Sequence, residues 1–343
     1  MKILLIGGTG RISLAISNLL LAQGHELYLV NRGNKNKELK EGNLKFITCD
    51  IANENEMAKL LQNLSFDVVA DFIAFTPEDL ARDYRLFKDK TKQFIFISSA
   101  SAYHKPPTDY LITEGTSLSN PYWQYSRDKI ACEDYLMKLY QKEGFPVTIV
   151  RPSHTYSNTS IPVAVHGNNG SWQIAKRMLE GKPVIIHGDG TSLWTMTHSS
   201  DFAKGFIGLL GNIHTIGEAV HITSDESLTW NQIHHAIADA LGVKLNPFYV
   251  SSTFLAACSP YGLEGNLIGD KANCVVFDNS KLKRLVPEFQ ATLCFDQGVK
   301  QAIDNILAHP EYQIEDPEFD KWCDNVITET NNAIKKVSDK SFL

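Results

Sequence analysis

The sequence predicts an α/β fold, in which a doubly wound parallel sheet is followed by a smaller mixed α/β domain toward the C-terminus. Short, continuously apolar runs recur through the first half, and such runs are typical of strands that are buried on both faces. Segments with helical spacing separate these runs, and a glycine-rich turn directly follows the first of them. Strands that alternate with helices in this way favour a parallel sheet with helices on both faces.

The elements of this sheet are expected in a regular order. Strands are expected at KILLI (2–6), HELYLVNRG (25–33), LKFITCD (44–50), FDVVADFIAF (66–75), QFIFISSASAY (93–103) and FPVTIVRP (145–152), with helices at 14–24, 53–63 and 77–88 and around residue 125.

The alternation loosens after residue 157. Helices are expected near 172–181, 201–211 and 295–313, and strands at 182–188 and 218–224. A further helix within 227–242 has Ser227 or Thr229 as its cap and ends at Gly242. The polar tail to residue 343 is expected to fray.

Composition limits the function classes. The chain has 343 residues, a hydrophobic fraction of 43% and a net charge of -6, which disfavours a nucleic-acid partner. No apolar run approaches the length of a membrane span, and no signal peptide is evident, so a cytoplasmic protein is expected. The six cysteines are scattered, and no cysteine or histidine cluster indicates a metal site.

The glycine-rich turn is the first functional motif. Gly7, Gly8 and Gly10 lie between the first strand and the first helix, with Ser13 where a third glycine is usual. Glycines let the backbone approach a pyrophosphate, and a helix N-terminus offers unpaired N–H groups. We therefore expect a Rossmann-type dinucleotide-binding domain at 1–157, to which 196–224 returns, and a mainly substrate-binding domain at 158–343.

The ends of the following strands predict the rest of the cofactor site. The second strand ends at Asn31-Arg32, where a fold that prefers NAD usually has an acid. Arg32, with Lys35 and Lys37 nearby, favours the 2′-phosphate of NADP, so the cofactor is NAD or NADP with NADP favoured. The predicted cofactor-binding residues are Gly7, Thr9, Gly10, Arg11, Ile12, Asn31, Arg32, Asp50, Ile51, Ala74, Tyr125, Lys129 and Pro152.

Tyr125 and Lys129 form the candidate catalytic pair. Four residues apart in a helix, they lie on one face. An ammonium group beside a phenol stabilises the phenolate, which makes proton exchange with an alcohol or carbonyl feasible. The fifth strand adds Ser98, Ser99 and Ser101 near its C-terminal end, where ligands bind in open α/β sheets.

In this order, GGTGRIS, ISSASAY, YSRDK and VRPSHTY resemble the extended short-chain dehydrogenase/reductases of the sugar-nucleotide epimerase/dehydratase type. GDGTSLWTMTHSSDFAKG and DNSKLKRL also match, and the glycine turn and NRG are similar to an atypical branch that includes chloroplast stem-loop-binding proteins. The resemblance implies that Tyr125 is the acid/base, that Lys129 binds the nicotinamide ribose and that Ser99 holds the substrate oxygen. Ser98 and Ser101 are competing choices for Ser99. It also implies a possible homodimer.

Departures from the family concern the substrate. Ala100 and Ser101 replace an Asp-Glu pair that is frequent in dehydratases, which disfavours 4,6-dehydration. His154 stands where nucleotide-binding members have Asn, and Trp194 where they have Arg. Loss of that Arg removes a bidentate phosphate clamp. Lys271 and Lys281 are alternative clamps, although a structural role is favoured for both; Ser101, His154 and Trp194 are the candidate substrate contacts.

The leading hypothesis is an NAD(P)-dependent oxidoreductase or epimerase that acts on a hydroxyl/keto carbon of a sugar or nucleotide sugar. One alternative is an NADPH-dependent carbonyl reductase with a non-nucleotide substrate. Another is a redox-inactive, RNA-associated or cofactor-sensing member of the same fold.

Overall fold

The computed structural model describes residues 1–33 and 39–338, so Lys35 and Lys37 lie outside the described residues. Contacts divide the chain into two compact units. The first contains Met1–Ser157, Thr195–Ser227 and Val275–Leu293, and the second contains Asn158–Trp194, Leu228–Cys274 and Cys294–Leu343. Each unit is described separately below.

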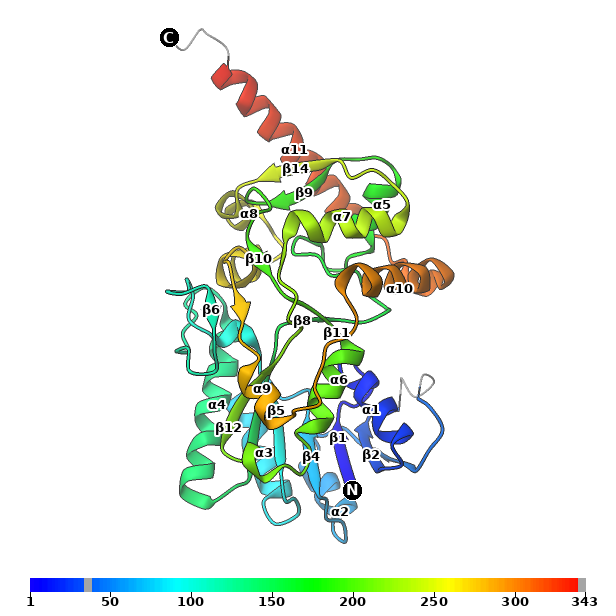
Figure 1. Cartoon of the computed structure of the whole chain (residues 1–343), viewed down its shortest axis with the longest axis vertical. Coiled ribbons are helices and arrows are strands. Elements are labelled where there is room, and N and C mark those ends of the chain that lie inside the picture. Colours follow the sequence, from blue (N-terminus) through cyan, green and yellow to red (C-terminus); the bar gives the residue numbers. More distant parts are fainter. Residues whose placement is uncertain (34–38, 339–343) are drawn as a thin grey trace. The chain divides into compact units, whose positions relative to one another are not determined.

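The first unit is built on a seven-stranded sheet, all of whose strand pairs are parallel (Figure 1). Its strand order is β12-β7-β5-β4-β1-β2-β3. The strands are β1 (Lys2–Ile6), β2 (Glu26–Asn31), β3 (Leu44–Thr48), β4 (Val68–Asp71), β5 (Phe94–Ile97), β7 (Val147–Pro152) and β12 (Glu218–Ile222). The predicted fold class is confirmed.

Both faces of this sheet are covered, which explains the continuous apolar runs. In β1, Leu4 and Ile6 belong to a core with α2, α3 and α4, whereas Ile3 and Leu5 belong to a core with α1, α6 and α9. The helices of this unit are α1 (Ser13–Ala22), α2 (Glu54–Leu60), α3 (Pro77–Phe87), α4 (Gln124–Glu143), α6 (Ser199–Gly208) and α9 (Ser280–Leu285), with 3₁₀ turns η1 (Ala100–Ala102) and η2 (Ile213–Thr215).

Two short parallel pairs complete the first unit. β8 (His154–Tyr156) pairs with β11 (Met196–His198). β6 (Leu111–Ile112) pairs with β15 (Val276–Phe277), which brings a late segment of the chain into this unit.

The second unit is mixed α/β. A parallel pair joins β9 (Val184–His187) to β14 (Pro247–Val250), and an antiparallel pair joins β10 (Leu193–Trp194) to β13 (Leu228–Thr229). Its helices are α5 (Trp172–Leu179), α7 (Trp230–Leu241), α8 (Ser252–Cys258), the π-helix η3 (Glu264–Lys271), α10 (Phe295–Ala308), the 3₁₀ turn η4 (Pro310–Tyr312) and α11 (Pro317–Ser338).

The two ends of α7 are set as its sequence predicts. Thr229 caps it in a reciprocal capping box with Gln232, and Gly242 ends it in the left-handed conformation. Residues 328–338 of the tail that was expected to fray continue α11, whereas the buried Phe319 and Cys323 anchor the first half of this helix.

Candidate functional site

The glycine turn after β1 can be formed only with glycine at its tightest point. Gly7 has φ +78°, and a Cβ there would lie 2.5 Å from Cγ2 of Ile73. Ser13, in place of the third glycine, ties the turn together: its hydroxyl donates to Gly7 O at 2.6 Å and accepts from Gly10 N at 2.9 Å. No described side chain caps the N-terminus of α1, and Leu14 N in its first turn donates to Gly10 O at 2.9 Å.

A cavity of about 380 Å³ opens beside this turn, at the C-terminal ends of β1, β2 and β3. Its inner wall is apolar and contains the buried Val30, Cys49 and Ile51. Its volume lies in the range of small-molecule sites. Of the predicted cofactor residues, Gly7, Thr9, Asn31, Arg32, Asp50 and Ile51 line the cavity; Val30, Cys49 and Ile73 also line it and were not predicted.

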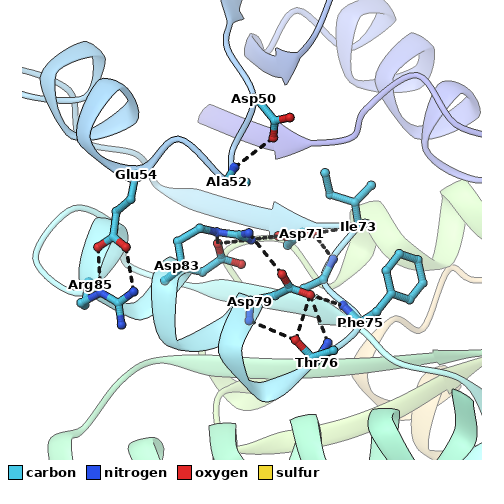
Figure 2. A network of polar contacts seen from close by, with 12 residues as sticks. Asp50, Ala52, Glu54, Asp71, Ile73, Phe75, Thr76, Asp79, Asp83 and Arg85 are labelled. Carbon is cyan, nitrogen blue, oxygen red and sulfur yellow. Dashed lines mark hydrogen bonds and ion pairs between the residues drawn. The ribbon is translucent and has the colours of Figure 1, made fainter. Parts of the chain in front are cut away.

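The polar rim of this cavity is exposed. Asn31 Oδ1 accepts from Gly33 N at 2.9 Å, and Asp50 Oδ1 accepts from Ala52 N at 3.0 Å (Figure 2). The side chains of Arg11 and Arg32 are both exposed. A missing Cβ at Gly7, an uncapped helix N-terminus and an apolar pocket fit the pyrophosphate and adenosine of a dinucleotide.

Lys129 is the central residue of the second part of the site. It extends from α4 into the interior, where it is 2% exposed, and its Nζ donates to Ala74 O and Ile97 O, both at 2.8 Å. Its Nζ also lies 5.8 Å from the centre of the Tyr125 ring. Burial lowers the pKa of Lys129 to about 8, so the ammonium is the main form at neutral pH.

Tyr125 lies one turn before Lys129 on α4 and is half-buried. Its ring packs 5.1 Å from the Trp123 ring and 6.3 Å from the Phe75 ring, measured between centres. Phe75 itself is 48% exposed, and the Lys129 ammonium lies 4.6 Å from the centre of its ring. Ala74 and Lys129, which were both predicted to bind the cofactor, are therefore in direct contact beside Tyr125.

The three candidate serines after β5 have different surroundings. Ser98 is buried, and its hydroxyl donates to Glu133, which also pairs with the buried Arg151. Ser101 is buried as well, whereas Ser99 is half-buried. Ser99 is thus the least enclosed of the three.

Ser99 ends a row of hydroxyl groups. Ser126 Oγ donates to Ser101 Oγ at 2.8 Å, and Ser101 Oγ lies 2.9 Å from Ser99 Oγ. Ser99 Oγ also accepts from Ser101 N at 3.2 Å. When Ser101 donates its proton to Ser99, the Ser99 hydroxyl retains its own proton for an external acceptor.

The remaining predicted residues lie in separate surroundings. Pro152 ends β7, and the half-buried His154 begins β8, both in the first unit. Trp194 belongs to the second unit, where it is 2% exposed and stacked on Trp230 with ring centres 6.3 Å apart. Trp194 is therefore part of an aromatic cluster.

The two lysines considered as substitute phosphate clamps already have partners. Lys271 Nζ lies 2.6 Å from Asn266 Oδ1 and 3.1 Å from Asp270 Oδ2. Lys281 Nζ pairs with Glu218 at 2.6 Å and donates to Ala219 O at 2.7 Å. These contacts favour the structural role for both.

A glycine-rich turn, an adjacent pocket and a buried lysine beside a tyrosine are the features expected of a dinucleotide-dependent enzyme of the short-chain dehydrogenase/reductase class. The model of the NAD dependent epimerase/dehydratase family matches residues 3–222. The chain therefore belongs to this family, and the predictions of family and enzyme class are confirmed.

The chain is similar to a reductase and to a protein named for RNA stem-loop binding. The chain is 24% identical to 2′-dehydrokanamycin reductase of Streptomyces kanamyceticus over 291 residues, which are 84% of this chain and 80% of that protein. It is 26% identical to chloroplast stem-loop binding protein of 41 kDa b of Arabidopsis thaliana over 254 residues, 70% of this chain and 63% of that protein.

Solved structures share the fold. UDP-glucuronic acid 4-epimerase of Bacillus cereus, in complex with UDP-glucuronic acid and NAD, has a TM-score of 0.71 at 21% identity and covers 90% of this chain and 99% of its own. Within the described residues, no helix is long and apolar enough to span a membrane, and no group of three possible metal ligands occurs.

Proposed function

We propose that this protein is an NAD(P)-dependent oxidoreductase or epimerase that acts on a hydroxyl/keto carbon of a sugar or nucleotide sugar. The observation that carries the proposal is the buried Lys129 ammonium, fixed by two carbonyl groups beside the Tyr125 ring. Two of its three N–H bonds are directed to Ala74 O and Ile97 O, and the third is available to a ribose hydroxyl.

In the oxidative direction, the Tyr125 phenolate, which the adjacent Lys129 charge stabilises, takes the proton of the substrate hydroxyl and becomes the neutral phenol. Ser99 donates its hydroxyl proton in a hydrogen bond to the same substrate oxygen. A nicotinamide held at this site would supply the hydride acceptor for oxidation and the hydride donor for reduction.

The proposal is tested by incubating the dinucleotide-loaded protein with a panel of nucleotide sugars and keto sugars. An epimerase returns its cofactor unchanged, whereas a reductase consumes NAD(P)H stoichiometrically. Absence of any dinucleotide binding, together with salt-sensitive RNA binding, would favour the RNA-associated alternative instead. Sedimentation of the same sample tests the expected homodimer.

We also propose NADP as the preferred cofactor. The end of β2 presents Asn31 and the exposed Arg32, and Arg11 is exposed after the glycine turn. A guanidinium group suits the 2′-phosphate, while an acid that would bind the ribose diol of NAD is missing from residues 31–33. Dissociation constants for NADPH and NADH test this preference, and tighter binding of NADH would contradict it.

A non-nucleotide keto sugar is the second candidate substrate class. It is supported by Trp194, which replaces a phosphate-binding Arg and is buried against Trp230, and by the partners of Lys271. The likeness to 2′-dehydrokanamycin reductase supports it too. Turnover of free keto sugars, with no turnover of UDP-sugars, would select this candidate over the first.

A further inference from the structure

Three acidic side chains surround the segment that follows β4, in a network that the proposed chemistry does not use (Figure 2). Asp71 ends β4, and Asp79 and Asp83 come from α3. Asp71 and Asp83 are 0% and 1% exposed, respectively, and Arg82 of α3 lies between them and Asp79. Such buried charge requires compensation.

The backbone of residues 73–76 is held by two of these carboxyl groups. Asp71 Oδ1 accepts from Ile73 N at 2.5 Å and from Ala74 N at 2.8 Å. Asp79 Oδ2 accepts from Phe75 N at 3.0 Å and from Thr76 N at 3.1 Å. Four consecutive amides thus depend on Asp71 and Asp79.

The second oxygens of Asp71 and Asp83 lack a hydrogen-bond donor among the described residues, although Arg82 Nη2 lies 3.7 Å from Asp71 Oδ2. Asp83 Oδ1 accepts from Arg82 Nε and Nη2, but no described residue donates a hydrogen bond to Oδ2 of either Asp71 or Asp83. Burial and the neighbouring Asp71 carboxyl raise the pKa of Asp83 well above its ordinary value. A proton on Asp83 that is donated to Asp71 would supply the missing hydrogen bond.

We propose that Asp71 and Asp83 share one proton, and that this acid–carboxylate pair, anchored by Arg82, positions residues 73–75 at the candidate cofactor site. Asp83 is the donor and Asp71 the acceptor of the shared hydrogen bond. Both are positioning residues, since neither lines the cofactor cavity.

The segment positioned in this way contributes three groups to the site. The Ile73 side chain lines the cavity against the glycine turn. Ala74 O accepts from Lys129, and the Phe75 ring packs between Lys129 and Tyr125. The consequence for catalysis rests on the proposed function of Lys129 and Tyr125, whereas the consequence for dinucleotide binding does not.

The first test is the pH dependence of stability for wild type, Asp83→Asn and the exposed control Asp89→Asn. A shared proton is retained in the folded state but released on unfolding, so this pair makes the folded state less stable as pH rises above the ordinary carboxyl pKa. The asparagine amide replaces the proton donor permanently. Asp83→Asn therefore gains stability relative to wild type as pH rises above the ordinary carboxyl pKa of about 3.9, and Asp89→Asn does not.

The charged groups that act on Asp83 and on its neighbouring carboxyl groups come from three elements. Arg82 faces it from α3 and Asp71 from β4, while Lys129 of α4 acts on Asp71 and Asp79. Arg82 stays charged throughout, and the pKa of Lys129 is lowered only to about 8. Histidines contribute equally to wild type and variants, so the difference between the melting temperatures reports on the pair. If Asp83→Asn does not fold, Asp71→Asn, which donates to Asp83 instead, gives the same test.

The second test separates positioning from stability. Asp83→Asn retains a donor and should keep the dissociation constant for NADPH within about twofold, whereas Asp83→Leu should raise it about tenfold at temperatures where the variant is folded. Asp83→Leu should also lower kcat at saturating NADPH, because Ala74 O no longer holds Lys129 in place. Rescue by Asn but not by Leu is the expected pattern.

Parallel pH slopes for wild type and Asp83→Asn, or equal NADPH affinities for the folded Asn and Leu variants, would overturn the inference. If Tyr125→Phe retained full activity while the pH slopes and affinities behaved as expected, the catalytic assignment would fail and the positioning pair would stand.

Discussion

The two ends of the candidate cofactor site differ in how firmly they are held. Around Lys129, a buried ammonium, two carbonyl acceptors and the carboxyl groups of Asp71 and Asp79 fix the backbone and the side chains. At the rim formed by Asn31, Arg32 and Asp50, the side chains are largely exposed, and two of them bond to nearby backbone amides. The rigid end suits chemistry, which needs fixed geometry, and the exposed rim suits selection between related cofactors.

The largest effect is expected at the rigid end. Tyr125→Phe removes the hydroxyl that exchanges the proton but keeps the ring, so kcat should fall about 10³-fold with little change in NADPH affinity. Steady-state kinetics and a binding titration measure the two quantities. Tyr110→Phe, at a 63% exposed tyrosine, is the matched control and should behave as wild type. Equal losses in kcat and affinity would assign Tyr125 to binding.

Lys129→Met should lower kcat about 10²-fold, because the charge that stabilises the phenolate is lost. The pKa of Lys129 is lowered to about 8 from an unfolded value of 10.5, so wild type gains stability as pH rises between these values. Melting curves should show that gain in wild type and its absence in Lys129→Met. An identical pH response of both proteins would mean that Lys129 is not buried as an ammonium.

At the exposed rim the effect should be smaller and selective. Arg32→Ala should raise the KM for NADPH about tenfold and leave the KM for NADH unchanged, because only NADPH carries the 2′-phosphate. Kinetics with both cofactors measure this difference. A matched change at another exposed cation, Lys40→Ala, should affect neither cofactor, and an equal loss with NADPH and NADH would remove Arg32 from cofactor selection.

The smallest effect is expected at Ser126, which acts on Ser99 through Ser101. Ser126→Ala cuts the hydrogen bond to Ser101, so Ser99 is less strongly oriented and kcat should fall about fivefold. The exposed Ser119→Ala is the control. An unchanged kcat in Ser126→Ala would show that the row of hydroxyl groups does not assist Ser99.

Local patterns were sufficient to predict the sheet and most of the residues at its C-terminal edge. Continuous apolar runs, the glycine turn and the Tyr125–Lys129 spacing each act over a few residues. The joining of 275–293 to the first unit was not predicted, because β15 pairs with β6 across a long stretch of sequence. The length of α11 was missed because its apolar stripe of Phe319, Cys323 and Val326 is sparse.

The positioning pair illustrates a different limit. Asp71 and Asp83 are separated by one loop and nearly two helical turns, and nothing in their spacing indicates a shared proton. Only burial and the lack of other donors among the described residues reveal that requirement. From the sequence, Trp194 could be interpreted only as the loss of a phosphate-binding Arg. Its stacking on Trp230 depends on tertiary structure and could not be predicted.

The central claim, that this site transfers hydride to a sugar carbon, is tested most directly with deuterium-labelled reduced dinucleotide and the panel of keto sugars. Mass spectrometry of the products should find one deuterium on carbon with wild type. The label should be absent from products of Tyr125→Phe, although that variant binds the same amount of dinucleotide. Unlabelled sugars after incubation with wild type that demonstrably holds the labelled cofactor would contradict the claim.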